Sequence, residues 1–261
     1  MTPPRSRFLG NTVSLAVATA VSTVLTLAQM KILAAYLPLA LFGLFASLRG
    51  LSLLVSILAA NGFPQALVRF LPEHAARAQR RVAVRASVIA IGATVAACVL
   101  MLGVMLALRG VFLSHIPAQE MGRPLITWFA ITTLAVALKL VLYGGFNGLR
   151  RFGSQTLLET LALAVQAGWM WHDRASLDLV HLFEIVGVTS AATVLVAIPW
   201  YAARLASDVE PGEVRPATMS YAHYWAGAVG LSIVALAFSD VDRWVLSNVL
   251  ALEVLSLFDV A

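Results

Sequence analysis

A polytopic bundle of membrane-spanning α-helices is the fold class that this sequence predicts. Hydrophobic residues make up 60% of the 261 residues and charged residues only 12%, against about 25% charged residues in a usual soluble domain. Asp, Glu, Lys and Arg are all absent from five stretches, at 8–30, 50–68, 86–108, 185–203 and 216–239. A helix that crosses the hydrocarbon core needs about 20 apolar residues, and five such stretches cannot all be buried within one soluble domain of this size.

The apolar stretches and their flanks predict about seven transmembrane helices. We place them at about 9–36, 41–63, 86–108, 124–147, 155–171, 180–203 and 221–249, and the fourth, fifth and seventh contain interior charges. The first apolar run is longer than the roughly 7–15-residue core of a signal peptide, so we interpret it as a retained membrane helix. Residues 1–205 are expected to form a six-helix lobe. Residues 206–261 would hold a cytoplasmic linker and the first helix of a truncated second lobe, which makes the chain an N-terminal fragment of a longer protein.

The distribution of arginine predicts a cytoplasmic N-terminus, because basic residues are enriched in inner segments. With that orientation the inner segments hold Arg5, Arg7, Arg69, Arg77, Arg80, Arg81, Arg85, Arg150, Arg151, Arg204 and Arg215, whereas the outer loops hold Arg109, Arg123 and Arg174. The cluster at 69–85 is typical of an orientation signal. It is also able to attract anionic lipid head groups, at about 1 kcal/mol per basic residue. Short basic loops of this kind do not build a nucleic-acid-binding face, despite the net charge of +5.

The sequence contains no motif that is typical of a metal or cofactor site. Cys98 is the single cysteine, which excludes an intrachain disulfide and a cysteine metal site. The five histidines are scattered without metal-ligand spacing, and neither a phosphate-binding glycine loop nor a paired-aspartate cluster of a membrane transferase is present. We therefore expect no cofactor, no metal and no enzymatic activity.

Charged residues inside the predicted spans are the candidate functional residues, because each costs about 2.5–3.5 kcal/mol or more at the membrane centre. Arg49, Lys139 and Glu159 lie about a third of the way into their spans, and Gln29 lies in the first. They are expected to line a water-filled cavity and bind a charged substrate. The alternatives are snorkelling to an interface and, for Lys139 and Glu159, a structural pair between neighbouring helices.

Two further features fall in the later spans. Asp240 and Asp242 are candidates for coupling to a cation, and the alternative is that Asp242 and Arg243 neutralise each other. Gly144 and Gly148 are four residues apart at the end of the fourth span. Such a pair of small residues allows another helix to approach closely.

The Phe42-Gly43 pair in 32–73, the glycines of 141–159 and the Asp242-Arg243 pair in 240–261 together resemble motifs of bacterial polysaccharide-export flippases. The segment 32–73 carries a Phe-Gly pair, Phe42-Gly43, and a pattern of Gly62, Ala66, Leu67 and Arg69 that is similar to the end of the family's second helix. The segment 141–159, VLYGGFNGLRRFGSQTLLE, resembles the turn between the family's fourth and fifth helices. The segment 240–261 resembles the seventh-helix region, with the Asp242-Arg243 pair followed by Phe258 and Ala261. Ser256 stands where the family usually has glycine, and the turn 38–41 lacks the usual acidic residue.

The resemblance implies two six-helix bundles around a central cavity. It also implies movement of undecaprenyl-pyrophosphate-linked oligosaccharide across the bacterial inner membrane by alternating access, for the synthesis of lipopolysaccharide and other surface polysaccharides. Membrane lipids and other polysaccharide-assembly membrane proteins would be partners, and Arg49 and Lys139 would meet the pyrophosphate or acidic sugars. The alternatives are a cation-coupled multidrug or metabolite antiporter of the same superfamily and a membrane-embedded glycosyltransferase or polymerase. An acidic residue deep in the first span would favour the antiporter, but residues 8–30 contain none, and the short outer loops argue against the enzyme.

Overall fold

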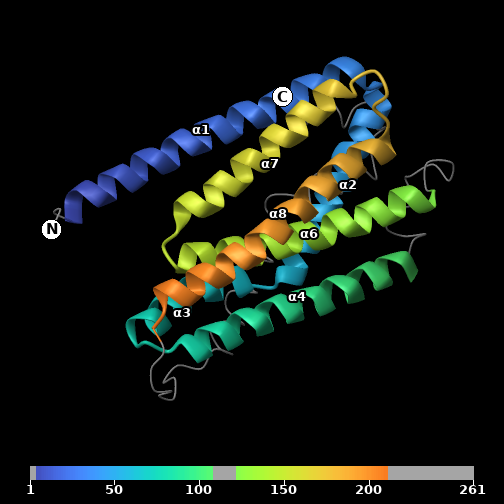
Figure 1. Cartoon of the computed structure of the whole chain (residues 1–261). Helices are drawn as coiled ribbons and strands as arrows, with labels where there is room; N and C mark the ends of the chain where they lie inside the picture. Colours follow the sequence, from blue (N-terminus) through green and yellow to red (C-terminus); the bar gives the residue numbers. More distant parts are fainter. Residues whose placement is uncertain (1–3, 108–121, 211–261) are drawn as a thin grey trace.

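The computed structural model describes residues 4–107 and 122–210, and these form seven α-helices with no strand among them. The helices are α1 (Pro4–Tyr36), α2 (Leu39–Ala60), α3 (Phe63–Ala76), α4 (Arg80–Ala107), α6 (Arg123–Gly148), α7 (Phe152–His172) and α8 (Leu179–Asp208). They run side by side in an elongated bundle (Figure 1). The predicted all-α class is confirmed, and six of the predicted spans coincide with helices to within a few residues.

Five of these helices are long and apolar enough to cross a membrane. The spans lie at Thr19–Tyr36 within α1, Leu39–Ala60, Arg80–Ala107, Arg123–Gly148 and Leu179–Asp208. The helix α7, which is the fifth predicted span, is not among them. The seventh predicted span and most of the predicted second lobe lie outside the described residues, and α8 continues past residue 205 to Asp208. The described chain is thus a multi-helix membrane bundle with five candidate spans rather than a confirmed seven.

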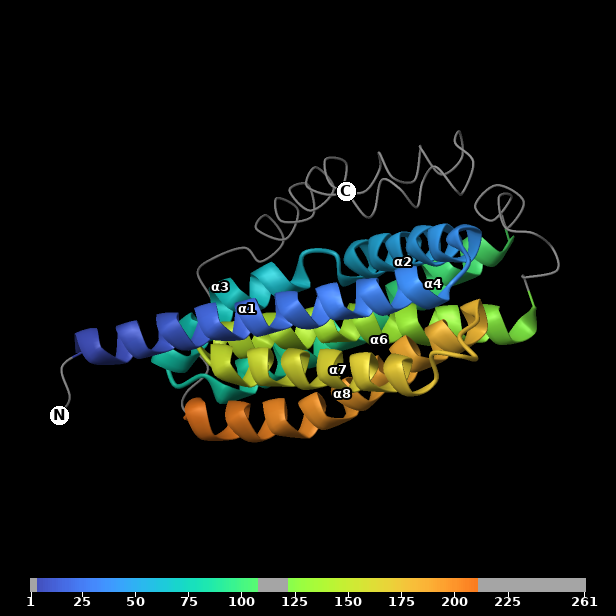
Figure 2. The same ribbon diagram turned by 90° about the horizontal axis from the view of Figure 1, so that it is seen from above.

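The helix α3 was not predicted, because its residues were divided between the end of the second span and an inner segment. Asn61 and Gly62 both adopt left-handed backbone angles, with φ values of 50° and 75°. Left-handed residues end α2, and glycine takes this conformation without a steric penalty. Pro64 then lies in the first turn of α3, where its missing N–H group is not needed. Figure 2 shows α3 continuing beyond the end of α2 along the side of the bundle.

The helix α6 occupies the centre of the bundle and contacts α2, α3, α4, α7 and α8. Three glycines near its end make the closest approaches. A Cβ atom on Gly144 would lie 2.5 Å from Pro64 Cα, and one on Gly148 would lie 2.5 Å from the Leu67 carbonyl oxygen. A Cβ atom on Gly145 would lie 2.7 Å from the Tyr201 ring. The predicted close approach at Gly144 and Gly148 is therefore confirmed, and its partner is α3.

Buried apolar side chains form two clusters, one toward each end of the bundle. The first includes Leu33, Phe45, Phe129 and Phe183. It joins α2 and the second half of α1 to the first halves of α6 and α8. The second includes Leu71, Phe146, Val194 and Tyr201 and joins α3 to the second halves of α6 and α8. Large apolar side chains also point outward, among them Val88, Val99 and Leu100 on α4, Leu161 and Val165 on α7, and Leu195 on α8. An apolar exterior of this kind suits contact with lipid tails.

The glycine contacts of α6 lead to a stability prediction. We expect Gly144→Ala to lower the free energy of unfolding by about 1–3 kcal/mol, because the added methyl group meets the backbone of Pro64. Gly168→Ala in α7 is the matched control, since nothing lies within 4 Å of its Cβ position, and it should be neutral or slightly stabilising. Thermal unfolding of both variants in detergent measures the difference. Equal unfolding temperatures for the two variants would contradict the close α3–α6 contact.

Candidate functional site

Buried and half-buried polar side chains gather inside the bundle, alongside the residues of the two apolar clusters. We call this set the polar layer; it comprises Gln29, Ser52, Ser56, Thr94, Thr132, Thr133, Lys139, Tyr143, Glu159, Gln166, Thr189, Ser190 and Thr193. Its members come from α1, α2, α4, α6, α7 and α8. Because a polar group without a partner is costly in an apolar medium, the side chains of the polar layer require either hydrogen bonds to one another or access to water.

A charged group of three side chains lies where α6 meets α7. Lys139 Nζ is 2.9 Å from Glu159 Oε2, and the Tyr143 hydroxyl donates a 2.8 Å hydrogen bond to the same oxygen. The Lys139 ammonium also lies 5.6 Å from the centre of the Tyr143 ring, within the range of a cation–π contact. The Lys139 side chain is 12% exposed and that of Glu159 is 35% exposed. The lysine is therefore enclosed, whereas its carboxylate partner faces the edge of the bundle.

A second group joins α1, α7 and α8 through amide side chains. Gln29 Nε2 donates to the Leu163 carbonyl oxygen at 2.9 Å, and it lies 3.5 Å from Gln166 Oε1. Gln166 Nε2 in turn donates to the Thr189 hydroxyl at 2.7 Å. Gln29 is only 1% exposed, and its Oε1 atom has no hydrogen-bond partner within the described chain. Gln29 thus presents an unused acceptor in the bundle interior.

A third group joins α2 to α6. The hydroxyls of Ser52 and Thr133 are 2.9 Å apart, and the Ser56 hydroxyl donates to the Thr133 carbonyl oxygen at 2.8 Å. Arg49 is half-buried and precedes Ser52 by three residues, so it shares this face of α2. Lys139 follows Thr133 by six residues, which is about 240° around the helix. Lys139 therefore does not share the α2–α6 interface with Arg49.

The structure brings three of the four predicted cavity residues together. Glu159, Leu163 and Gln166 follow one another along one face of α7 at helical spacing, and Glu159 and Leu163 are about 6 Å apart along the axis. Lys139 binds the first of them, and Gln29 binds the other two. Arg49 lies on α2, which contributes no side chain to the contacts just described, and Asp240 and Asp242 lie outside the described residues. The Lys139–Glu159 pair is the structural pair that the sequence left open as an alternative to two independent cavity residues.

Several members of the polar layer carry no charge and were missed by a search for charged residues. Tyr143 follows Lys139 by four residues, and Gln166 follows Glu159 by seven. Ser52 and Ser56 are also four apart, and each of these spacings places two side chains on one face of a helix. A search for uncharged polar residues at helical spacing within the apolar spans would have found them.

A separate polar cluster lies at the turn between α7 and α8. Asp173 Oδ2 accepts a 2.7 Å hydrogen bond from Trp169 Nε1, and it lies 2.8 Å from His181 Nε2. The hydrogen bond with His181 is the main cause that holds the pKa of the Asp173 carboxyl below its usual value; burial acts in the opposite direction, and the Trp169 hydrogen bond lowers the pKa further. His181 Nδ1 is also 3.3 Å from Glu184 Oε2. No group of three or more His, Cys, Asp and Glu side chains in the described part of the chain is arranged to hold a metal ion.

The chain matches no protein-family model, no curated protein and no solved structure. Its own residues and geometry therefore carry the functional argument.

The charged group at α6 and α7 leads to a double-mutant prediction. We expect Lys139→Met alone to lower the free energy of unfolding by about 2 kcal/mol, because Glu159 is left without its cation. This is less than the roughly 3–5 kcal/mol of a fully buried pair, since Glu159 is partly exposed. The combined variant Lys139→Met with Glu159→Gln should recover most of the loss. Equal destabilisation by the single and combined variants would show that the pair contributes little as a unit.

The Asp173 cluster leads to a pH prediction. An aspartate whose pKa is lowered by folding contributes stability above its unfolded pKa of about 3.9, and that contribution is lost as the pH falls through the folded pKa. Asp173→Asn should therefore unfold at a lower temperature than the wild type at pH 5, and the difference should shrink as the pH falls below about 4. Thermal unfolding across this range measures it. A difference that stays constant down to about pH 3 would contradict the lowered pKa.

Proposed function

We propose that the chain forms part of a bacterial inner-membrane transporter that moves an undecaprenyl-pyrophosphate-linked oligosaccharide to the outer leaflet by alternating access. The observation that carries the proposal is the polar layer, with its Lys139–Glu159 pair between α6 and α7. Transporters hold their substrate sites near the middle of the membrane, at the junction of helices. The resemblance of three segments to polysaccharide-export flippases supplies the class of cargo.

The chemistry of Lys139 suits an anionic head group. An ammonium in an enclosed, low-dielectric site offsets the cost of removing a pyrophosphate from water. Lys139 is already neutralised by Glu159 at 2.9 Å, so a phosphate oxygen would take the place of the carboxylate beside the ammonium. Glu159, which is partly exposed, would then take up a proton or turn toward water. Binding would thus loosen the α6–α7 contact, which is the kind of differential interaction that shifts a two-state equilibrium.

The antiporter is the second candidate, and Glu159 is the observation that favours it. Intramembrane carboxylates often bind protons or cations in such proteins. In the structure, however, Glu159 accepts from both Lys139 and Tyr143, so its charge is already balanced. A cation would have to compete with an ammonium that lies in direct contact. This arrangement suits the attraction of an anion to Lys139 better than the attraction of a cation to Glu159.

Deletion of the intact gene in its host is the test. Loss of the transporter should trap an undecaprenyl-pyrophosphate oligosaccharide on the cytoplasmic side and abolish the surface polysaccharide. Extraction and mass spectrometry of the lipids identify the trapped species and therefore the cargo. Unchanged lipid intermediates together with a normal surface glycan would reject the flippase and favour the antiporter, which drug-sensitivity profiles would then test.

Complementation of the deletion strain separates a functional lysine from a structural one. Lys139→Met should fail to restore export. The combined Lys139→Met and Glu159→Gln variant should fail as well, although its stability recovers. Lys31→Met is the matched control, because Lys31 is exposed near the end of α1, and it should restore export. Full export by the combined variant would assign Lys139 a purely structural role.

A further inference from the structure

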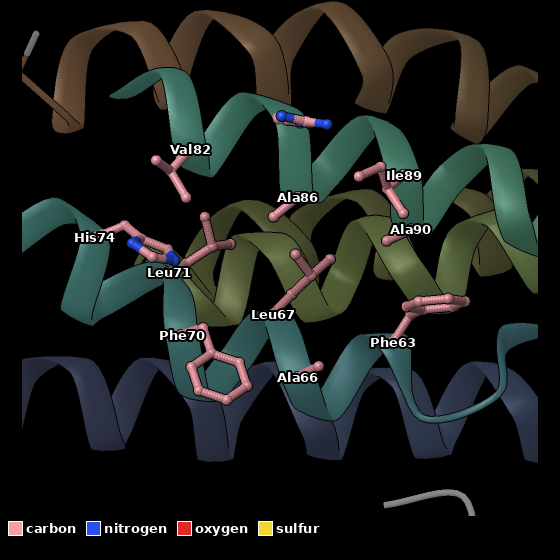
Figure 3. Close-up of a pocket in the computed structure, with 11 residues that line it drawn as sticks. Phe63, Ala66, Leu67, Phe70, Leu71, His74, Val82, Ala86, Ile89 and Ala90 are labelled. Carbon is pink, nitrogen blue, oxygen red and sulfur yellow. The ribbon is translucent and has the colours of Figure 1, made fainter. Parts of the chain in front are cut away.

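An apolar groove lies between α3 and α4, away from the polar layer. It has a volume of about 480 Å³, within the range of roughly 300–1,000 Å³ that is usual for pockets holding small ligands. Its walls are Phe63, Leu67, Phe70 and Leu71 from α3, and Val82, Ala86, Ile89 and Ala90 from α4. Figure 3 shows Leu67 and Leu71 from α3 and Val82 and Ile89 from α4 pointing into the space between the two helices. None of the predicted cavity residues lines it.

The groove is open to the surroundings of the bundle. Ile89 on its wall is 54% exposed, although α4 is one of the candidate membrane spans. An exposed apolar wall on a span faces lipid tails, so the medium that reaches this groove is hydrocarbon rather than water. A groove of this kind in a membrane helix pair accepts an acyl chain without a cost in polar desolvation.

One arginine lines this groove, and a second arginine lies next to it on α4. Arg85 lines it, and Arg81 lies four residues earlier on the same face of α4; both are exposed. Two cations at this spacing repel each other. Arg81 also lies in the first turn of α4, which contains no acidic residue, so its charge opposes the positive end of the helix dipole. Among residues 4–107 and 122–210, Arg77 is paired with Glu73 at 2.7 Å, whereas neither Arg81 nor Arg85 forms an ion pair.

We propose that the α3–α4 groove binds an anionic phospholipid, with one acyl chain against the groove wall and the phosphate between Arg81 and Arg85. The anion relieves the repulsion between the two arginines and the unfavourable helix end at once. The acyl chain of the lipid covers Ile89, which no protein side chain covers fully. This site is separate from the polar layer and does not depend on the proposed export activity.

Retention of lipids by the purified full chain tests the proposal. The protein is reconstituted in nanodiscs of equal parts phosphatidylcholine and phosphatidylglycerol, and native mass spectrometry counts the lipids that stay bound after release. We expect the wild type to retain phosphatidylglycerol preferentially. Each of Arg81→Gln and Arg85→Gln should reduce that preference about fivefold, which corresponds to about 1 kcal/mol per arginine.

Two pairs of variants distinguish the site from general attraction. Ala86→Phe fills the groove and should remove the retained lipid, whereas Ala96→Phe places the same ring on an exposed position of α4 outside the groove and should not. Arg174→Gln removes a half-buried cation at the α7–α8 turn, outside the groove, and should leave the lipid preference unchanged. Comparison of unfolding temperatures establishes that each variant is folded.

Three results would overturn the proposal. Equal retention of phosphatidylglycerol by the wild type and the Arg81→Gln/Arg85→Gln variant would show that the arginines do not hold the phosphate. Unchanged retention by a folded Ala86→Phe variant would place the lipid elsewhere. A dimer that Ala86→Phe disrupts, with no lipid retained by the wild type, would assign the groove to a second copy of the chain instead.

Discussion

The close approach of α6 to its neighbours is the constraint on which the rest of the bundle depends. Within a membrane, apolar side chains gain little by leaving lipid for protein, so helices associate through tight packing and through polar contacts. Gly144 and Gly148 admit the backbone of α3, and Gly145 admits the Tyr201 ring of α8. These contacts hold α6 at the centre, and α2, α4 and α7 then pack around it. The three glycines, which have no side chains, thus set the position of α6, the helix that carries Lys139.

The polar layer also contributes to the association of the helices. Its hydrogen bonds let the bundle keep polar side chains in its interior. Each interface contributes a short set of hydrogen bonds, such as Ser52 with Thr133 between α2 and α6 and Gln166 with Thr189 between α7 and α8. Interhelical bonds of this type are worth about 0.6 kcal/mol on average. They add little stability individually, but they specify the rotation of each helix. The same rotation sets Lys139 against Glu159.

The charged group differs from these hydroxyl and amide contacts, because it places an ion pair where neutral pairs would suffice. Replacing a buried ion pair with apolar side chains is often neutral or stabilising, so stability alone does not account for Lys139 and Glu159. Tyr143 adds a third member that donates to the shared oxygen. Glu159 accepts from both Lys139 and Tyr143. If another anion binds Lys139, Glu159 can leave the ammonium and keep its hydrogen bond from Tyr143. This property connects the packing of α6 and α7 to the proposed export.

The sequence by itself determined the all-α class and the approximate ends of six helices. These properties are local, because a run of apolar residues and its breaks suffice to define a span. A search for membrane spans does not find the helix α3, because α3 is too short and too charged to cross a membrane. The two left-handed residues Asn61 and Gly62 separate it from α2. Only the tertiary structure decided that Lys139 binds Glu159 and that Gln29 meets Gln166. Those pairings depend on the rotation and separation of helices, and residues far apart in the chain set both.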